Sequence, residues 1–440
     1  MKFNKLYMLA MLVALPQALG AQEAWDLRKC IDHALENNLT VKSGEVSVQQ
    51  SEVDLNTAKN SRLPDLAASA GQNFSFGRGL SESNTYVNTN TASTSFSLGS
   101  SVNVFNGFMT NRTIKMDALN LEAATADLEK ARDDIRVQVT RAYVQILYDM
   151  EILQVAERQV SIDSVQVDRL RAMLENGKAS PSELAQQEAA LGQSRLTATQ
   201  ASNTLNLSVL DLAQLLELPS PSGFSIVVPE IPDCLALPGA GPEDIYASAV
   251  AVRPAVKAEQ FRLEAADMNI RIARSSLYPS LTLNGGIGSN FYKSNGYESA
   301  DFWGQMKNNF SQYVGLSLNI PIFTRFSTRN SIRTATLSRT RQMIQLESVR
   351  KSLYKEIQQA WYNAVASGAK LSSCAGALDS AEKSFELMAA RYENGKASIT
   401  EFNESKNNVM KAQSDLAQAR FENLFQIKLL DFYAGAEISL

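Results

Sequence analysis

The sequence is poor in the side chains from which most active sites and metal centres are built. It holds one histidine and three cysteines in 440 residues. The cysteines, Cys30, Cys234 and Cys374, lie far apart and have no spacing typical of metal ligands. His33 has no partner cluster, and the chain shows no nucleophile–base spacing. We therefore expect a protein that is not an enzyme and has no cofactor or metal centre.

Long hydrophobic runs are also missing after the first 21 residues. Lys2 and Lys5 precede the apolar run Leu6–Leu15, and small residues follow it up to Ala21. This pattern predicts a removable signal peptide over 1–21, because the run is too short to span a bilayer. No later stretch approaches the roughly 18 apolar residues of a transmembrane helix. The net charge of −4 becomes more negative once both lysines are removed, which argues against a nucleic-acid partner.

Two long stretches contain no proline and almost no glycine. Neither residue occurs between Gly107 and Glu175, and only Gly368 and Gly376 interrupt 326–393. Each stretch therefore predicts a helix of about 65 residues, on the order of 100 Å long. Apolar residues recur at helical spacing, at Ile135, Val139, Ala142, Tyr143, Ile146 and Leu147 and again at Leu353, Ile357, Ala360, Trp361, Ala364 and Val365. We expect these stripes to pack helix against helix, as in a tube or stalk.

The chain is an internal duplication. The same six residues occur at Glu175–Ser180 and Glu393–Ser398, and the match extends at nearly constant spacing to pairs such as Val41 with Val256, Pro64 with Pro279 and Phe105 with Phe323. A period this long indicates a duplicated half-protein rather than a short solenoid repeat. We therefore divide the mature chain into a first repeat over 22–216, an irregular proline-rich linker over 217–244 and a second repeat over 245–440.

Four segments have the alternation of strands, at about 66–76, 95–105, 281–291 and 313–323. One face is apolar and the other carries Ser, Gly and Asn, while aromatic residues gather at the segment ends. An ordinary soluble β-sandwich is one interpretation. We favour a membrane β-barrel with an apolar face toward lipid and a polar lumen. Because four strands cannot close a barrel and open edges are not tolerated in lipid, several chains must share it; two chains give eight strands and three give twelve.

The repeated hexapeptide predicts a tight turn between two helices in each repeat. Glycine supplies the left-handed residue after the first helix, and a serine caps the next one. A glutamate three residues after each serine, Glu183 or Glu401, completes a capping box. Each turn is either simply a good turn or a docking edge for the helices of a partner. The candidate docking residues are Gly177, Lys178, Ala179, Ser180, Gly395, Lys396, Ala397 and Ser398.

Taken together, the order and spacing of these pieces resemble the TolC-like outer-membrane efflux proteins over nearly the whole mature length. No single motif is specific, but their order and duplication are. The matching pieces are the opening Leu27–Leu39, the pairs Leu63-Pro64 and Tyr278-Pro279, the passages Asn103–Gly107 and Asn319–Phe323, and the two Gly-x-x-Ser turns.

The resemblance implies a mainly helical fold with membrane strands. Four strands from each of three chains would form a 12-stranded outer-membrane barrel, continued by a helical barrel in the periplasm of a Gram-negative-type bacterium. It also implies docking of the turns to a periplasmic adaptor protein and an inner-membrane pump. The expected function is passive exit of drugs or other small molecules. A duct for type I protein secretion and a non-conducting periplasmic coiled-coil scaffold are the alternatives.

The resemblance also implies a gate near the turns. Ser182 and Glu183 occupy one side of a polar link in the family, and Tyr392 the other, whereas Ala397 stands where the family has an arginine. Glu401 and Glu404 occupy the positions of acidic rings that narrow the opening. Three chains would then place six carboxylates around it and favour cations. The simpler interpretation gives Glu401 only a capping role and Glu404 a solvated position.

Overall fold

The computed structural model describes residues 24–80, 84–88, 90–221, 223–230, 237, 239, 241–295 and 300–439. The expected signal peptide and Cys234 lie outside these residues. The chain divides into two compact units, which we call the hairpin unit (Met1–Lys42, Ala131–Ala249 and Tyr354–Leu440) and the sheet unit (Ser43–Lys130 and Val250–Leu353). Each unit takes segments from both sequence repeats, so the boundary between the units is not the boundary between the repeats.

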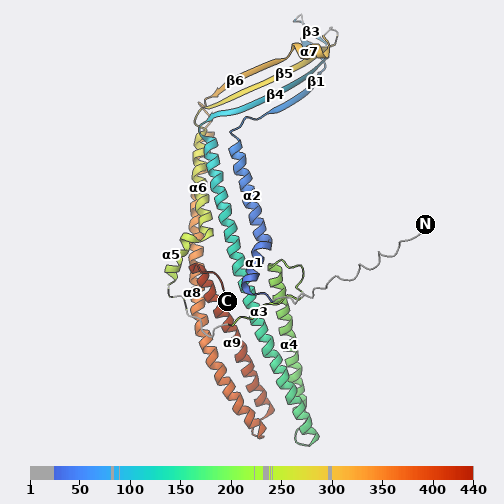
Figure 1. Ribbon diagram of the computed structural model, residues 1–440, viewed down its shortest axis with the longest axis vertical. Coiled ribbons are helices and arrows are strands. Elements are labelled where there is room, and N and C mark those ends of the chain that lie inside the picture. The colour runs from blue at the N-terminus through green and yellow to red at the C-terminus, as the bar shows by residue number, and fades with distance from the viewer. Residues whose placement is uncertain are drawn as a thin grey trace, which may run out of the picture. The chain divides into compact units, whose positions relative to one another are not determined.

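The sheet unit contains a four-stranded antiparallel sheet (Figure 1). Its spatial order is β1 (Ala67–Ser75), β4 (Thr91–Asn106), β5 (Ser280–Ser294) and β6 (Ser311–Asn319). The longest pairing joins β4 of the first repeat to β5 of the second. The strands β1 and β6 are therefore the two edges, and among the described strands neither has a partner on its outer side.

The strands differ from the sequence expectation in two places. The fourth strand ends at Asn319 rather than near 323, because Pro321 has no N–H to donate to a sheet. The alternation expected to continue through Val104 is broken by a register shift between Asn103 and Phe105. The connections between the strands also contain regular structure, namely a short hairpin of β2 (Arg78–Leu80) with β3 (Tyr86–Asn88) and the helix α7 (Phe302–Asn308).

Four helices adjoin the strands, in the same lateral order as the sheet. They are α2 (Leu39–Asn60), α3 (Met109–Glu175), α6 (Pro254–Ser275) and α8 (Ser327–Glu393). Three hydrogen bonds within the sheet unit follow this order. Arg62, just after the end of α2, donates to Asn111 of α3 at 2.7 Å. Arg112 of α3 donates to the Arg271 carbonyl of α6 at 2.8 Å, and Arg339 of α8 donates to Asp267 of α6 at 2.8 Å. Thus α2 and α8 are the outer helices of this layer.

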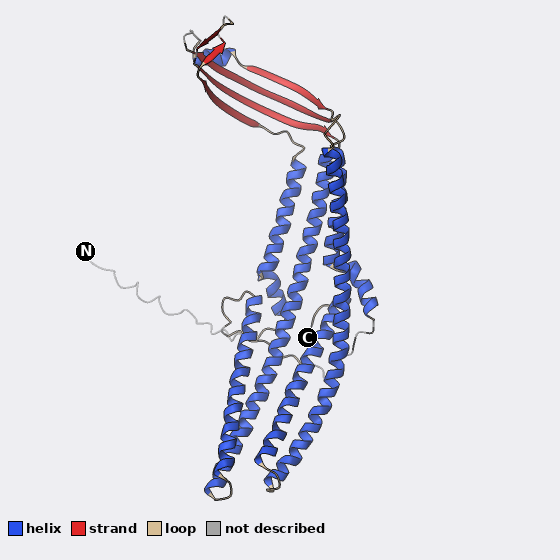
Figure 2. Ribbon diagram, turned by 180° about the vertical axis from the view of Figure 1, so that it is seen from behind, coloured by secondary structure: helices blue, strands red, loops and turns tan. Residues whose placement is uncertain are grey.

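The hairpin unit is built from two long helical hairpins. The first joins α3 to α4 (Pro181–Leu215), and the second joins α8 to α9 (Ile399–Ala434). Figure 2 shows the two turns at the same end of this unit. The unit also contains α1 (Leu27–Asn37) and most of α5 (Pro242–Val252). The helix α1 ends at Asn37 with Asn38 as its C-cap, and α6 starts at Pro254 with Arg253 as its N-cap.

The predicted apolar stripes lie largely in the interior. On α3, Val139, Tyr143 and Ile146 are almost completely buried, and on α8 the same holds for Ile357 and Ala364. Val365, which we placed in the second stripe, is exposed instead. None of the described helices has a stretch that is both long and apolar enough to cross a membrane.

Tyr143 also anchors two distant segments. Its hydroxyl donates to the Val227 carbonyl at 2.5 Å and lies 3.3 Å from the Trp25 carbonyl oxygen. Trp25 pairs with Ile226 in a short parallel bridge. One buried tyrosine of α3 therefore holds the start of the described chain and the linker between the repeats together.

Candidate functional site

The two hairpin turns have the same backbone conformation. Gly177 and Gly395 have φ angles of +68° and +65°, where a side chain is disfavoured. The N–H of Lys178 donates to the Met173 carbonyl at 2.8 Å, and that of Lys396 makes the equivalent 2.8 Å bond. This is the Schellman arrangement, which satisfies carbonyls at the end of a helix. The glycines are needed for their backbone angles, since an added Cβ would find open space at both.

Both predicted capping boxes are confirmed. The Ser180 hydroxyl accepts from the Glu183 N–H at 3.1 Å, and the Glu183 carboxylate accepts from the Ser180 N–H at 2.7 Å. Ser398 and Glu401 repeat the pattern at 3.2 and 2.7 Å. Each turn is therefore followed at once by a well-started helix, which makes the tip compact.

An apolar cluster joins the two hairpins just inside the turns. Its buried members are Leu170 of α3 and Ile399 and Phe402 of α9. Half-buried side chains packed on them are Ala179, Leu184, Phe385, Ala389 and Tyr392. The Tyr392 ring stacks on Phe402, with centroids 4.9 Å apart and planes at 29°. The cluster therefore holds the tip region of the two hairpins together through side chains from four helices and one turn.

Two of the proposed gate residues, Glu183 and Tyr392, lie near each other, but not as a hydrogen-bonded link. Burial raises the pKa of Tyr392, and the nearby Glu183 carboxylate raises it further while Arg169 lowers it. Within the described chain no hydrogen bond joins the Tyr392 hydroxyl to Ser182 or Glu183, and the Glu183 carboxylate is engaged in its own capping box. Tyr392 is thus held mainly by packing and feels Glu183 through its charge.

Two exposed polar contacts also connect the hairpins. Arg169 of α3 pairs with Glu393 at 3.2 Å, and Gln186 of α4 donates to Thr400 of α9 at 3.2 Å. Side chains this exposed remain hydrated, so contacts of this kind contribute about 0–1 kcal/mol each. They can break without a large penalty.

A third connection is buried. Lys406 of α9 donates to the carboxylate of Asp163 on α3, and the two side chains are 4% and 1% exposed. The same carboxylate accepts hydrogen bonds from Gln159, Gln187 and Ser194. Asn403 of α9 donates to Gln187 at 3.1 Å and accepts from Lys406 at 3.2 Å. Because removal of one partner strands a charge in the interior, breaking such a pair costs about 3–5 kcal/mol.

Our sequence reasoning did not identify Asp163. The sequence offered one signal, because Asp163 is an acidic residue at a position that continues the helical spacing of the buried stripe of α3. A second one, Asp149, lies 14 residues earlier (163 − 149 = 14) and accepts from Ser208 of α4 and from Gln145. Its partner Ser208 likewise lies 14 residues from Ser194 (208 − 194 = 14). The α3–α4 hairpin thus contains two buried polar layers two heptads apart, which fix the pairing register.

Glu401 and Glu404 lie on the solvent side of α9. Both are exposed, whereas Phe402 and Lys406 on the same helix are buried. Hydrogen bonds from the Ser398 N–H and then from its hydroxyl lower the pKa of the Glu401 carboxyl. In the single chain the Glu401 carboxyl is therefore held in its ionised form.

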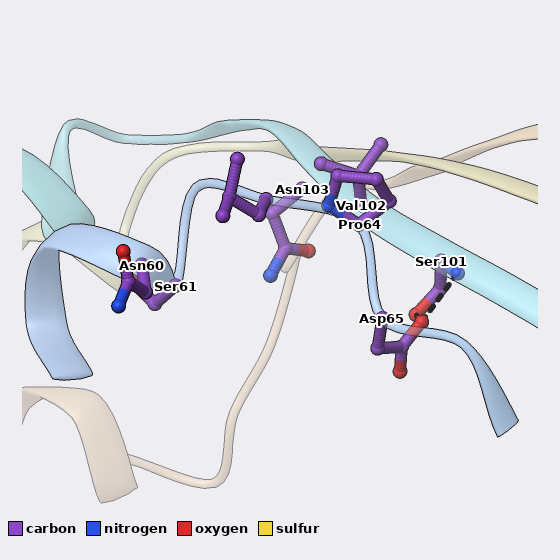
Figure 3. Close-up of a pocket in the computed structure, with 8 residues that line it drawn as sticks. Asn60, Ser61, Pro64, Asp65, Ser101, Val102 and Asn103 are labelled. Carbon is purple, nitrogen blue, oxygen red and sulfur yellow. Dashed lines mark hydrogen bonds between the residues drawn. The ribbon is translucent and has the colours of Figure 1, made fainter.

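A hollow in the sheet unit is lined mainly by uncharged residues. In the sheet unit a cavity of about 350 Å³ lies where the first strand begins (Figure 3). Its one titratable lining residue, Asp65, accepts from the Ser101 N–H at 2.5 Å and from its hydroxyl at 2.9 Å. Of the described residues, no three His, Cys, Asp or Glu side chains converge where they could hold a metal ion. Cys30 is buried and Cys374 half-buried, and both are free thiols.

Comparison with known proteins identifies the family. The family described as outer membrane efflux protein matches residues 30–217 and 245–428. The outer membrane efflux protein BepC of Brucella suis is 22% identical over 397 residues, which cover 88% of this chain and 80% of BepC. The pyoverdine export outer membrane protein OpmQ of Pseudomonas aeruginosa is 24% identical over 421 residues, covering 93% and 84%.

The fold is also that of solved outer-membrane proteins. The crystal structure of VceC from Vibrio cholerae matches with a TM-score of 0.76 at 18% identity, covering 94% of this chain and 97% of VceC. The match extends over the helices and strands of both repeats, as the sequence resemblance implied. The chain belongs to the outer membrane efflux protein family.

Proposed function

We propose that three copies of this chain form a passive exit duct in the outer membrane, through which small molecules leave the cell. The observation that carries the proposal is the pair of unpaired edges, β1 and β6, in a sheet of four strands. In lipid such edges leave backbone N–H and C=O groups unsatisfied, so the sheet must be completed. Three chains with four strands each supply the twelve strands of a closed barrel (3 × 4 = 12).

The outer helices of the sheet unit support the proposal that further copies of the same chain close the barrel. On α2, Val46 and Val53 are one heptad apart and 63% and 59% exposed. On α8, Leu337 and Ile344 are also one heptad apart and 70% and 63% exposed. Heptad-spaced apolar residues form the seam of a coiled coil. Pairing of α2 with α8 of the next chain joins unlike edges, and such an interface forms a ring when the rotation between neighbouring chains closes.

The hairpin tips supply the inner end of the proposed duct. The exposed Glu401 and Glu404 of three chains would give six carboxylates around one opening, and a ring of this charge favours cations. The compact turns at Gly177–Ser180 and Gly395–Ser398 are the surfaces that we assign to a periplasmic adaptor protein, itself coupled to an inner-membrane pump. The duct then catalyses no reaction, since the pump supplies the energy.

A small-molecule cargo is favoured by the relatives. OpmQ is named for pyoverdine export, and another relative, FusA of Burkholderia cepacia, for fusaric acid resistance. FusA is 24% identical over 287 residues, which span 63% of this chain and 51% of FusA. A gene for a proton-driven pump beside this one supports the assignment, whereas an ATP-driven exporter of proteins beside it favours a secretion duct.

The duct is tested by recording ion currents from the purified protein in planar bilayers. We expect discrete cation-preferring steps from the wild type. The double variant Glu401→Gln/Glu404→Gln should lose most of that preference while Glu386→Gln, a similarly exposed residue on α8, should keep it. Glutamine preserves the capping box, so a change in selectivity reports charge rather than lost structure. Protein that never yields ion steps would instead be a periplasmic scaffold.

A further inference from the structure

The buried ion pair between Asp163 and Lys406 is not part of the sequence duplication. Shifting by 218 residues, the spacing that relates the two turns, places Ala381 opposite Asp163 and Glu188 opposite Lys406. Ser194, which donates to Asp163, corresponds to Ala412. The charged network therefore exists once in each chain. It joins α9 of the second hairpin to both helices of the first.

The position of Lys406 on α9 relates it directly to the two exposed carboxylates. At about 100° per residue, Lys406 lies about half a turn around the helix from the mean direction of Glu401 and Glu404. Ile399, Phe402 and Asn403 share the side of Lys406 and contact the first hairpin. Rotation of α9 about its own axis would thus move the carboxylates and withdraw Lys406 from Asp163 together.

We infer that Asp163 and Lys406 are positioning residues. They fix the rotation of α9 against the first hairpin and thereby keep Glu401 and Glu404 on the side of α9 that faces away from that hairpin. Apolar contacts such as those of Phe402 tolerate sliding, because they are not directional. The Asp163 carboxylate instead accepts from four side chains at defined positions, and among these four donors Lys406 is the one cation. The two hairpins of one chain consequently move as one body around Asp163 and Lys406. The exposed Arg169–Glu393 pair cannot replace this buried ion pair.

The inference is tested with the single variants Lys406→Met and Asp163→Asn and with the double variant Asp163→Asn/Lys406→Met. Each single change leaves one uncompensated buried charge. The double change leaves none, and the new amide oxygen still accepts from Ser194 and Gln159, which both donate to the same oxygen, Oδ2, of Asp163. Lys383→Met is the matched control, since Lys383 pairs with Asp379 at 2.6 Å on the surface with side chains 70% and 64% exposed.

The first readout is amide hydrogen exchange over residues 399–410. We expect each single variant to exchange on the order of 100-fold faster there, in keeping with the cost of isolating a buried charge. The double variant should recover most of this protection, and the Lys383→Met control should match the wild type. Unchanged exchange in the single variants, or a double variant as unprotected as the single ones, would overturn the inference. This readout requires no ion current, so it stands whether or not the duct assignment is correct.

The second readout is the cation preference of the current, and this part rests on the proposed function. A merely structural pair would alter stability without altering selectivity in channels that remain assembled. We expect the single variants to lose preference although both carboxylates are present, and the double variant to regain it. Assembled channels of Lys406→Met with wild-type selectivity would contradict the positioning role. A wild type that conducts no ions would contradict the duct while leaving the exchange result valid.

A gentler variant covers the case in which the single charge changes prevent folding. Asn403→Ala removes the bond to Gln187 and the 3.2 Å contact with Lys406, but leaves the ion pair in place. We expect faster exchange over 399–410 than in the wild type and slower exchange than in any charge variant that folds. Exchange identical to that of the wild type would contradict a directional network at this layer.

Discussion

Glu183 and Glu401 make the same hydrogen bond in the two halves of the chain. Each carboxylate accepts, at 2.7 Å, from the N–H of the serine three residues before it. The duplication is therefore preserved in the geometry of the turns as well as in their sequence. This equivalence gives the first prediction.

Removing the capping hydroxyl should loosen both turns alike. We expect Ser180→Ala to reduce the stability of the first turn of α4 by about 1 kcal/mol, because one helix N–H loses its acceptor. Ser398→Ala should have an effect of the same size on α9. Amide exchange of the first turns measures both. Ser380→Ala is the control, since the Ser380 hydroxyl donates only to the Gly376 carbonyl of its own helix. A large difference between the two capping variants would contradict equivalent turns.

The same cap makes a prediction about pH. Hydrogen bonds from Ser398 lower the folded-state pKa of Glu401. The stabilisation is therefore fully present above the unfolded-state pKa and disappears as the pH falls through the lowered folded-state value. Exchange at the start of α9, corrected for the intrinsic rate, should be constant near neutral pH and rise on strong acidification. Glu401→Gln should remove this dependence, and its persistence in that variant would assign it to another group.

Glycine at the turns and glycine within a helix should respond oppositely to alanine. Gly177→Ala should destabilise the first hairpin by about 1 kcal/mol, since φ is +68° there and left-handed angles are costly for alanine. Gly192→Ala should stabilise α4 by up to about 1 kcal/mol, because Gly192 lies within the helix and an added Cβ meets open space. Local amide exchange distinguishes the signs. Stabilisation by Gly177→Ala would show that the turn does not require this angle.

Larger replacements of the two turn glycines test whether the turns dock to the adaptor protein. We expect Gly177→Val and Gly395→Val to weaken cross-linking of the tips to the adaptor protein in cells more than they weaken the trimer. Gly192→Val provides a change of equal bulk at a distance from the turn. If the trimer is lost while cross-linking of the remaining assemblies is normal, the turns have a structural role only.

Several features could be predicted from the sequence because they depend on neighbouring residues. The left-handed glycines of the turns and the two capping boxes belong to this class. The burial of Tyr143 also followed from helical spacing. The predicted end of β6 near 323 was wrong, because apolar alternation continues beyond Asn319 although Pro321 interrupts the strand.

The remaining features depend on residues far apart in the chain. Asp163 and Lys406 are 243 residues apart, and their pairing follows only from how two hairpins pack. Likewise, the hydroxyl of Tyr143 binds the Val227 carbonyl 84 residues away. Helical spacing indicated that this tyrosine would be buried, but it could not show which carbonyl satisfies its hydroxyl.

Tyr143→Phe should therefore loosen the attachment of the linker between the repeats. The variant keeps the buried ring but leaves the Val227 carbonyl without the hydroxyl that donates to it at 2.5 Å. A cost of about 1–3 kcal/mol is expected for an unsatisfied buried acceptor. Amide exchange and limited proteolysis of residues 223–230 measure the loosening. Tyr362→Phe, at an exposed position of α8, is the control, and equal behaviour of the two variants would contradict an anchoring role.

The exposed stripe of α2 should be needed for assembly but not for folding of one chain. Val46→Lys and Val53→Lys place charges on the seam that we assign to contact with the next chain, whereas Ser47→Lys adds the same charge beside it. We expect the two valine variants to reduce the fraction of trimer in detergent, and Ser47→Lys to have little effect. Retention of full assembly by both valine variants would remove α2 from the interface.

The most direct test of the account is the number of chains in the particle extracted from outer membranes, measured by native mass spectrometry after release from detergent. Completion of a four-stranded sheet by further copies predicts three chains and a particle that needs detergent to remain in solution. A single chain that remains in solution without detergent, with β1 and β6 covered by its own residues, would contradict it.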